Sequence, residues 1–117
     1  METPTYYDQV FAVTREVPHG RVTTYGAIAD FLALGSARMV GWALNKVATG
    51  LDVPAHRVVN RKGELSGRVH FRPPGRMQEL LEAEGVTVEN DQVQNFKELL
   101  WIPAEHLNQE QFDERFE

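Results

Sequence analysis

The sequence predicts a mostly α domain with a small β hairpin, of the winged helix-turn-helix type. Apolar residues recur at helical spacing in three successive segments, residues 5–17, 24–32 and 36–47. A tight glycine-containing turn joins the second segment to the third, which is the pattern of a helix-turn-helix. The apolar run at 57–60 is followed by a turn and by a return segment that starts at 65–67, and this predicts the hairpin or wing.

Turn and capping residues mark the ends of these three helices. Pro18 and Gly20 end the first helix, because proline lacks an amide proton and glycine favours turns. Thr24 and Ser36 stand where N-caps are expected for the second and third helices. Gly35 ends the second helix just before the third begins.

The third helix places Val40, Leu44 and Val47 on one face and Arg38 in its first turn. An arginine at the start of a recognition helix can reach a phosphate or enter a base stack. Taken alone, this position favours the plainer interpretation of a solvated helix arginine.

The last third of the chain predicts short elements. Residues 77–85 form an amphipathic helix whose inward positions are Met77, Leu80 and Leu81. Residues 86–90, VTVEN, predict a short strand. We expect a domain at 1–103 and an acidic C-terminal helix or tail at 104–117.

The composition limits the possible function classes. The chain has 117 residues, of which 42% are hydrophobic, and this suits one compact domain. No apolar run approaches the roughly 20 residues that span a bilayer. The sequence has no cysteine, which excludes disulfides and thiolate metal sites and fits a cytoplasmic location. We expect a cytoplasmic monomer with no membrane partner, no metal and no cofactor.

The charge is distributed unevenly along the chain. The net charge is −5, yet residues 15–76 contain ten Lys or Arg against four Asp or Glu. Residues 77–117 contain two Lys or Arg against eleven Asp or Glu. A basic middle followed by an acidic end suggests a face that binds a polyanion, although an unevenly charged solvated surface is an equal alternative.

Three residues outside the helix-turn-helix are candidates for a site. His56 is a titratable group beside the bend that Pro54 fixes. Glu84 falls on the buried side of its helix, where a carboxylate needs a partner, and His56 is the candidate. Arg68 follows the predicted hairpin. Each residue also has a plain structural explanation. His56 can be a buried structural histidine, Glu84 a carboxylate at the edge of the core in water, and Arg68 a surface charge.

The chain resembles the DNA-binding domain of O6-alkylguanine-DNA alkyltransferases over about residues 6–90. The resemblance rests on four motifs in unbroken order: VPHGRVTTYGAIA, SARMVGWAL, VPAHRVVNRKGEL and LLEAEGV. The family's central motif is Pro-Cys-His-Arg-Val, and its cysteine takes the alkyl group from a guanine flipped out of the duplex. Here Ala55 occupies that position. Alkyl transfer requires an activated thiolate, so the resemblance implies a non-enzymatic protein with a vestigial site of Ala55, His56 and Glu84.

This combination resembles the alkyltransferase-like proteins, many of which have tryptophan at the cysteine position. They bind O6-alkylguanine in double-stranded DNA, do not repair it, and present it to nucleotide excision repair. By this resemblance Tyr25 helps to rotate the nucleotide and Arg38 takes the place of the flipped base. The implied DNA-binding residues are Tyr25, Ser36, Ala37, Arg38 and Arg68. The implied lesion pocket consists of Tyr25, Pro54, Ala55, Val58 and Arg68.

The chain departs from the family in three places. The family's hinge asparagine has no clean match, and Asn45 is the nearest candidate. The segment HFRPPGR at 70–76 replaces the small-residue loop that closes the alkyltransferase pocket. The acidic segment after about residue 104 lies outside the resemblance.

Three other interpretations stay open. An alkyltransferase inactivated by a Cys→Ala change would show the same central motif. A transcriptional regulator would use the winged helix-turn-helix in the major groove and bind one undamaged sequence. A hydrolase would use His56 and Glu84, but the sequence offers neither a nucleophile nor a metal cluster for it.

Overall fold

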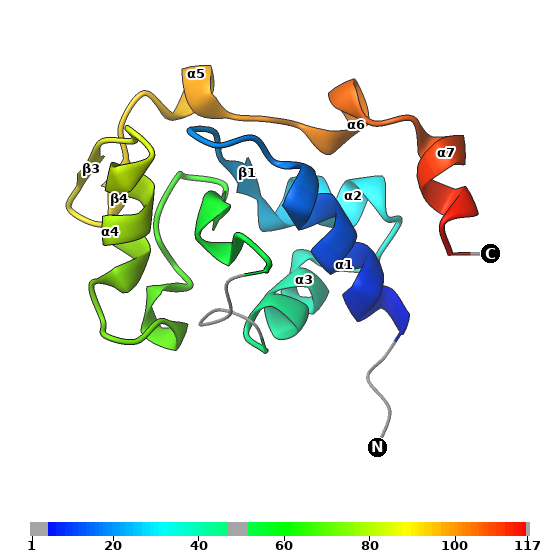
Figure 1. The fold of residues 1–117 in the computed structure, drawn as a ribbon, viewed down its shortest axis with the longest axis horizontal. Coiled ribbons are helices and arrows are strands. Elements are labelled where there is room, and N and C mark those ends of the chain that lie inside the picture. The colour runs from blue at the N-terminus through cyan, green and yellow to red at the C-terminus, as the bar shows by residue number, and fades with distance from the viewer. Residues whose placement is uncertain (1–4, 47–51, 117) are drawn as a thin grey trace.

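The computed structural model describes residues 5–46 and 52–116 (Figure 1). The helices in these ranges are α1 (Thr5–Glu16), α2 (Tyr25–Phe31), α3 (Ala37–Leu44), α4 (Arg76–Ala83), α5 (Phe96–Leu99), α6 (Pro103–His106) and α7 (Gln109–Glu114). The 3-10 turns are η1 (Ala55–Arg57) and η2 (Arg68–His70), and the strands are β1 (Thr23–Thr24), β2 (Val58–Val59), β3 (Val88–Glu89) and β4 (Gln92–Val93). The predicted mostly α class is confirmed, and no helix of the described ranges has the length and apolar character that crossing a membrane requires.

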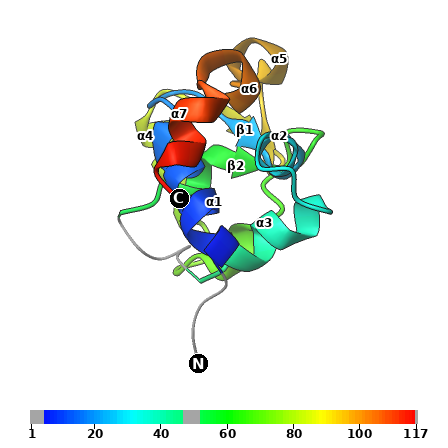
Figure 2. The same cartoon turned by 90° about the vertical axis from the view of Figure 1, so that its right-hand side faces the viewer.

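The predicted helix-turn-helix is formed by α2 and α3, and α1 packs beside them (Figures 1 and 2). Thr24 is the N-cap of α2, and its Oγ1 accepts a hydrogen bond from the Ala27 amide at 3.0 Å. Ser36 occupies the N-cap position of α3 without making such a bond. The helix α3 ends at Leu44, and Val47 lies outside the described residues.

The predicted position of the hairpin is wrong. The strand β2 pairs in parallel with β1, so that Thr23 lies opposite Val58 and Thr24 opposite Val59. Both valines are fully buried, and a strand buried on both faces pairs with another interior strand instead of forming an exposed wing. Residues 65–67 form no strand.

The small hairpin of the structure lies between β3 and β4, which pair antiparallel with Val88 opposite Val93. Asn90 and Asp91 connect the two strands and have φ angles of 53° and 59°. Two consecutive positive φ angles are what a type I′ hairpin turn requires, and Asn and Asp adopt them more readily than most residues. The strand β3 lies within the predicted segment 86–90, so that prediction is confirmed.

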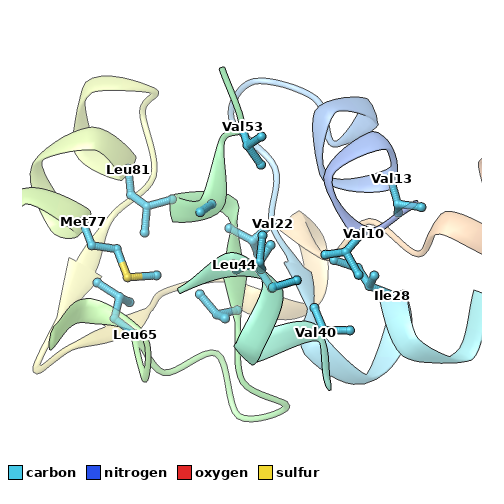
Figure 3. Close-up of a cluster of buried hydrophobic side chains, with 14 of the residues drawn as sticks. Val10, Val13, Val22, Ile28, Val40, Leu44, Val53, Leu65, Met77 and Leu81 are labelled. Atoms are coloured by element: carbon cyan, nitrogen blue, oxygen red, sulfur yellow. The ribbon is translucent and has the colours of Figure 1, made fainter. Parts of the chain in front are cut away.

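One hydrophobic core joins the helix-turn-helix to α4 across the β1–β2 pair (Figure 3). The residues with at most 1% exposure include Val10, Val13, Ile28 and Val40 on the first side and Leu65, Met77 and Leu81 on the second. The predicted inward positions Met77 and Leu81 are thereby confirmed, and Leu80 is half-buried against the same core. The core therefore holds α3, η1 and α4, the elements that carry the candidate residues, in one interior.

The C-terminal segment packs against the rest of the domain at two places. The Trp101 amide donates a hydrogen bond to the Val22 carbonyl at 2.7 Å, and Figure 1 shows this stretch crossing above β1. The ring of Phe112 in α7 is buried, with its centroid 5.2 Å from that of Phe31 in α2. The division of the chain at residue 103 stays a prediction.

Candidate nucleic-acid interface

A bend at Pro54 carries Ala55 and His56 into the interior. Pro54 has φ −77° and ψ 64°, and the Ala55 amide donates to the Val53 carbonyl at 2.7 Å, which defines an inverse γ-turn. The 3-10 turn η1 follows and leads directly into β2. As a result Ala55 and His56 are only 6% and 9% exposed.

The carboxylate of Glu84, at the C-terminal cap of α4, accepts hydrogen bonds from three residues that belong to two separate segments. Its Oε2 lies 2.7 Å from Nε2 of His56 and 2.8 Å from Nη2 of Arg57. Its Oε1 accepts from the Gly20 amide at 3.0 Å. The contact between His56 and Glu84 that the sequence suggested is therefore present.

Sequence reasoning missed two members of this network, Arg57 and Gly20. Arg57 also donates from Nη1 to the Val17 carbonyl at 2.8 Å, so it connects α4 to the end of the first helical segment. Gly20 has a φ of 82°, a conformation that favours glycine. The contact of Arg57 could have been predicted from its position directly after His56, because one buried carboxylate can accept hydrogen bonds from both side chains.

The charges of the network follow from its surroundings. Burial alone would raise the pKa of Glu84, but the hydrogen bonds from Arg57, the Gly20 amide and His56 outweigh it and lower the pKa to about 2. Burial lowers the pKa of His56, and the nearby positive charge of Arg57 adds to this, while Glu84 opposes it. At neutral pH His56 is therefore neutral and donates its Nε2 proton to the Glu84 carboxylate. Because residue 55 has no acidic proton to give, the network joins segments and activates nothing.

The exposed side of α3 faces a cavity of about 360 Å³. Its lining residues are Tyr25, Ala37, Arg38, Gly41, Trp42, Asn45, Ser66, Gly67 and His70. The cavity therefore lies between α3 and the segment 66–70, with the first residue of α2 at its end. It brings together three of the predicted DNA-binding residues, Tyr25, Ala37 and Arg38.

A second cavity, of about 450 Å³, lies on the other side of Tyr25. Its lining residues are Tyr25, Gly26, Ala37, Asn60, Arg61, Lys62 and Glu64. Tyr25 and Ala37 line both cavities and so separate them. Burial raises the pKa of the Tyr25 hydroxyl, and its hydrogen bond to Ser66 opposes the shift.

Of the residues predicted for the lesion pocket, Tyr25 lines both of these cavities. Four of them line neither of these two cavities: Pro54, Ala55, Val58 and Arg68. The side chain of Val58 in β2 is fully buried in the core, and its place in the lesion pocket stays a prediction. Arg68 is exposed, with its Nε 3.5 Å from Oδ2 of Asp91. Ser36 is also exposed, at the start of α3, and does not line these cavities.

Metal ligands do not gather in the described ranges. Within residues 5–46 and 52–116 no group of three or more His, Cys, Asp or Glu side chains is placed to hold a metal ion.

The sequence and the fold both match known proteins. The family model "6-O-methylguanine DNA methyltransferase, DNA binding domain" matches residues 5–86. Alkyltransferase-like protein 1 of Schizosaccharomyces pombe is 34% identical over 108 residues, which are 88% of this chain and 100% of the relative. A DNA base-flipping protein of Vibrio parahaemolyticus is 42% identical over 81 residues, 68% of this chain and 79% of the relative.

A solved structure of S. pombe Atl1, in complex with damaged DNA containing O6-carboxymethylguanine, has a similar fold. Its TM-score is 0.74 at 33% identity, and the match covers 86% of this chain and 98% of that one. At this identity and coverage the shared architecture extends over nearly the whole of the solved chain.

Proposed function

Since the chain belongs to the family of the 6-O-methylguanine DNA methyltransferase DNA-binding domain, we propose that it is a DNA-damage sensor that binds O6-alkylguanine in duplex DNA by nucleotide flipping. It is a non-enzymatic, alkyltransferase-like protein. The position of the family's nucleophile holds Ala55, and the 117 residues include no cysteine that could replace it.

The observation that carries this proposal is the retention of the site around a missing nucleophile. His56 and Glu84 lie 2.7 Å apart directly beside Ala55, as they would to support a reactive residue. Tyr25 and Arg38, the residues assigned to flipping, line one cavity although they come from different helices. The parts needed to extrude and hold a base are thus proposed to remain, while the part needed to react with it is absent.

The electrostatics of this face suit a DNA backbone. Arg38 is exposed on α3, and the exposed Arg61 and Lys62 line the second cavity on the other side of Tyr25. Cations on both sides of the proposed flipping residue can contact phosphates in either direction along the strand. Extrusion of a base costs a few kcal/mol, and the cost is lower for an alkylated guanine because it pairs poorly.

A sensor that leaves the alkyl group in place requires a second activity to remove the lesion. We therefore also propose that the bound protein marks the site for nucleotide excision repair, and that it acts as a cytoplasmic monomer. The strongly acidic residues 77–117 give the protein a second kind of surface, distinct from the basic middle of the chain.

The direct test is binding to matched duplexes with and without one O6-methylguanine. We expect a preference of about tenfold or more, or ~1.4 kcal/mol, for the modified duplex because its base flips at lower cost. Labelled methyl groups are expected to stay on the DNA after prolonged incubation. Label recovered on the protein would disprove the non-enzymatic function, and tight binding to one undamaged sequence would favour a transcriptional regulator.

Gly67 offers a test of the Tyr25 assignment. A Cβ at residue 67 would lie 2.7 Å from the Tyr25 hydroxyl, so Gly67→Ala must displace that side chain. We expect affinity for the modified duplex to fall about tenfold, ~1.4 kcal/mol, with flipping reduced and the fold retained. A fluorescent base analogue at the lesion position reports flipping. Gly35→Ala is the matched control, because a Cβ there meets nothing within 4 Å, and equal behaviour of the two variants would argue against the role of Tyr25.

A further inference from the structure

Trp42 has a large apolar side chain that is exposed to solvent on the cavity side of α3. Its side chain is 51% exposed, and Val69 in η2, at 62%, is the other large apolar residue with high exposure in the described ranges. An exposed apolar side chain taken singly is unremarkable in a soluble protein. These two come from α3 and η2, the elements on opposite sides of the 360 Å³ cavity.

The position of Trp42 on α3 places it next to the proposed flipping residues. The buried face of α3 carries Val40, Ala43 and Leu44. Trp42 follows Arg38 by four residues, so their Cβ atoms are neighbours, about 5–6 Å apart on the opposite face. Both side chains line the cavity that Tyr25 also lines.

The chemistry of the cavity suits a nucleotide. None of its nine lining residues, all within the described ranges, is acidic, and Arg38 contributes a positive charge. Its volume of about 360 Å³ lies in the range of small-molecule sites. An indole offers a flat apolar face, and stacking on such a face tolerates any base because every base has a π surface.

We propose that Trp42 is a DNA-contacting residue whose indole stacks on the extruded nucleotide at this cavity. The inference rests on the proposed function and adds to it a third contact beside Tyr25 and Arg38. In this arrangement Arg38 fills the gap left in the duplex, Tyr25 turns the nucleotide, and Trp42 holds it after rotation. Stacking does not involve the hydrogen-bonding edge of the base, so Trp42 contributes affinity for the flipped state and not recognition of one alkyl group.

Intrinsic fluorescence isolates the contact. The chain has two tryptophans, and Trp101 is 5% exposed and stacked on His106 at a ring-centroid distance of 5.0 Å. A change of emission on DNA binding therefore reports mainly Trp42. We expect the modified duplex to quench and blue-shift the emission of the wild-type protein, and Trp42→Phe to abolish most of the response. An unchanged emission at saturating modified duplex would overturn the inference.

Affinity provides the second measurement. Trp42→Ala is expected to weaken binding of the O6-methylguanine duplex about tenfold, ~1.4 kcal/mol, and binding of the unmodified duplex less than about threefold. Trp42→Phe keeps an aromatic face and is expected to stay within about threefold of wild type. Met39→Ala, which truncates an α3 side chain that lines neither cavity, is the matched control. Thermal unfolding of each variant verifies the fold.

The outcomes separate the inference from the proposed function. If the wild-type protein prefers the modified duplex and Trp42→Ala binds it as tightly as wild type, the inference fails and the sensor function stands. If Trp42→Ala loses affinity equally for both duplexes, Trp42 contacts the backbone and the inference is again wrong. If the wild-type protein shows no preference for the modified duplex, the proposed function itself fails.

Discussion

Glu84→Ala is expected to destabilise the fold by about 3–5 kcal/mol, the cost of removing one partner from a buried charge network. The Glu84 side chain is 7% exposed and accepts hydrogen bonds from His56, Arg57 and the Gly20 amide. Its removal leaves the Arg57 guanidinium, whose side chain is 16% exposed, without its carboxylate. Chemical denaturation monitored by circular dichroism measures the loss directly.

The control for this variant lies on the same helix. Glu82→Ala removes an exposed carboxylate from α4, and we expect a change of no more than about 0.5 kcal/mol. Glu84→Gln should fall between the two, because the amide keeps the shape and some acceptor capacity but lacks the charge. A Glu84→Ala protein as stable as the Glu82→Ala protein would show that the network contributes little to folding.

The same network sets the acid sensitivity of the wild-type protein. The pKa of Glu84 is about 2 in the folded protein against 4.5 for an ordinary glutamate, so its stabilisation is complete above about pH 4.5 and is lost as the pH falls toward 2. His56 acts in the same direction, since its pKa is lowered below 6.5 and the unfolded chain takes up that proton first as the pH falls. Glu84→Ala should therefore lose less stability than wild type between pH 4.5 and pH 2.

Arg38→Ala is expected to weaken binding of the modified duplex by about 1–3 kcal/mol, the scale of losing one stacked or bidentate contact. Arg38 is exposed on α3 and lines the same cavity as Tyr25, so the truncation removes the proposed DNA contact and leaves the core intact. Without a side chain to occupy the gap in the duplex, the flipped state should also be less populated. Titration with a fluorescent base analogue at the lesion position measures both quantities.

A charge-matched control distinguishes insertion from simple electrostatics. Arg76→Ala removes one positive charge from α4, where Nη1 of Arg76 lies 3.6 Å from Oε2 of Glu79. We expect this variant to lower the affinity for both duplexes slightly and to leave flipping unchanged. If Arg76→Ala and Arg38→Ala had equal effects, Arg38 would contribute only a charge.

Local signals made the helices predictable. The start of α2 follows from Thr24, whose hydroxyl caps the helix, and its end from the helix-breaking Gly35, which lies four residues after Phe31. The interior of α4 follows from the spacing of Met77 and Leu81. Each of these signals acts within one or two helical turns, so the sequence contains it without reference to the rest of the fold.

Long-range pairing could not be predicted in the same way. The valines of β2 suggested a hairpin because a nearby turn follows them, but their partner β1 lies far earlier in the chain. The complete burial of Val58 likewise depends on the packing of β2 against distant segments. The contacts of Arg57 and Gly20 with Glu84 could not be predicted for the same reason, because they depend on how distant segments pack.

The parallel pair β1–β2 also determines where this chain can change in length. Tyr25, the proposed flipping residue, directly follows β1, and η1 leads directly from Ala55 into β2. One residue inserted between β1 and Tyr25, or between Ala55 and β2, would shift Tyr25 relative to Ala55 by about 3.3 Å, the rise of one strand residue. An insertion in the exposed bend at residues 72–75 leaves the pairing untouched. Insertions and deletions should therefore accumulate among related chains at that bend and be excluded beside the strands, and the same bend is the place for an inserted label.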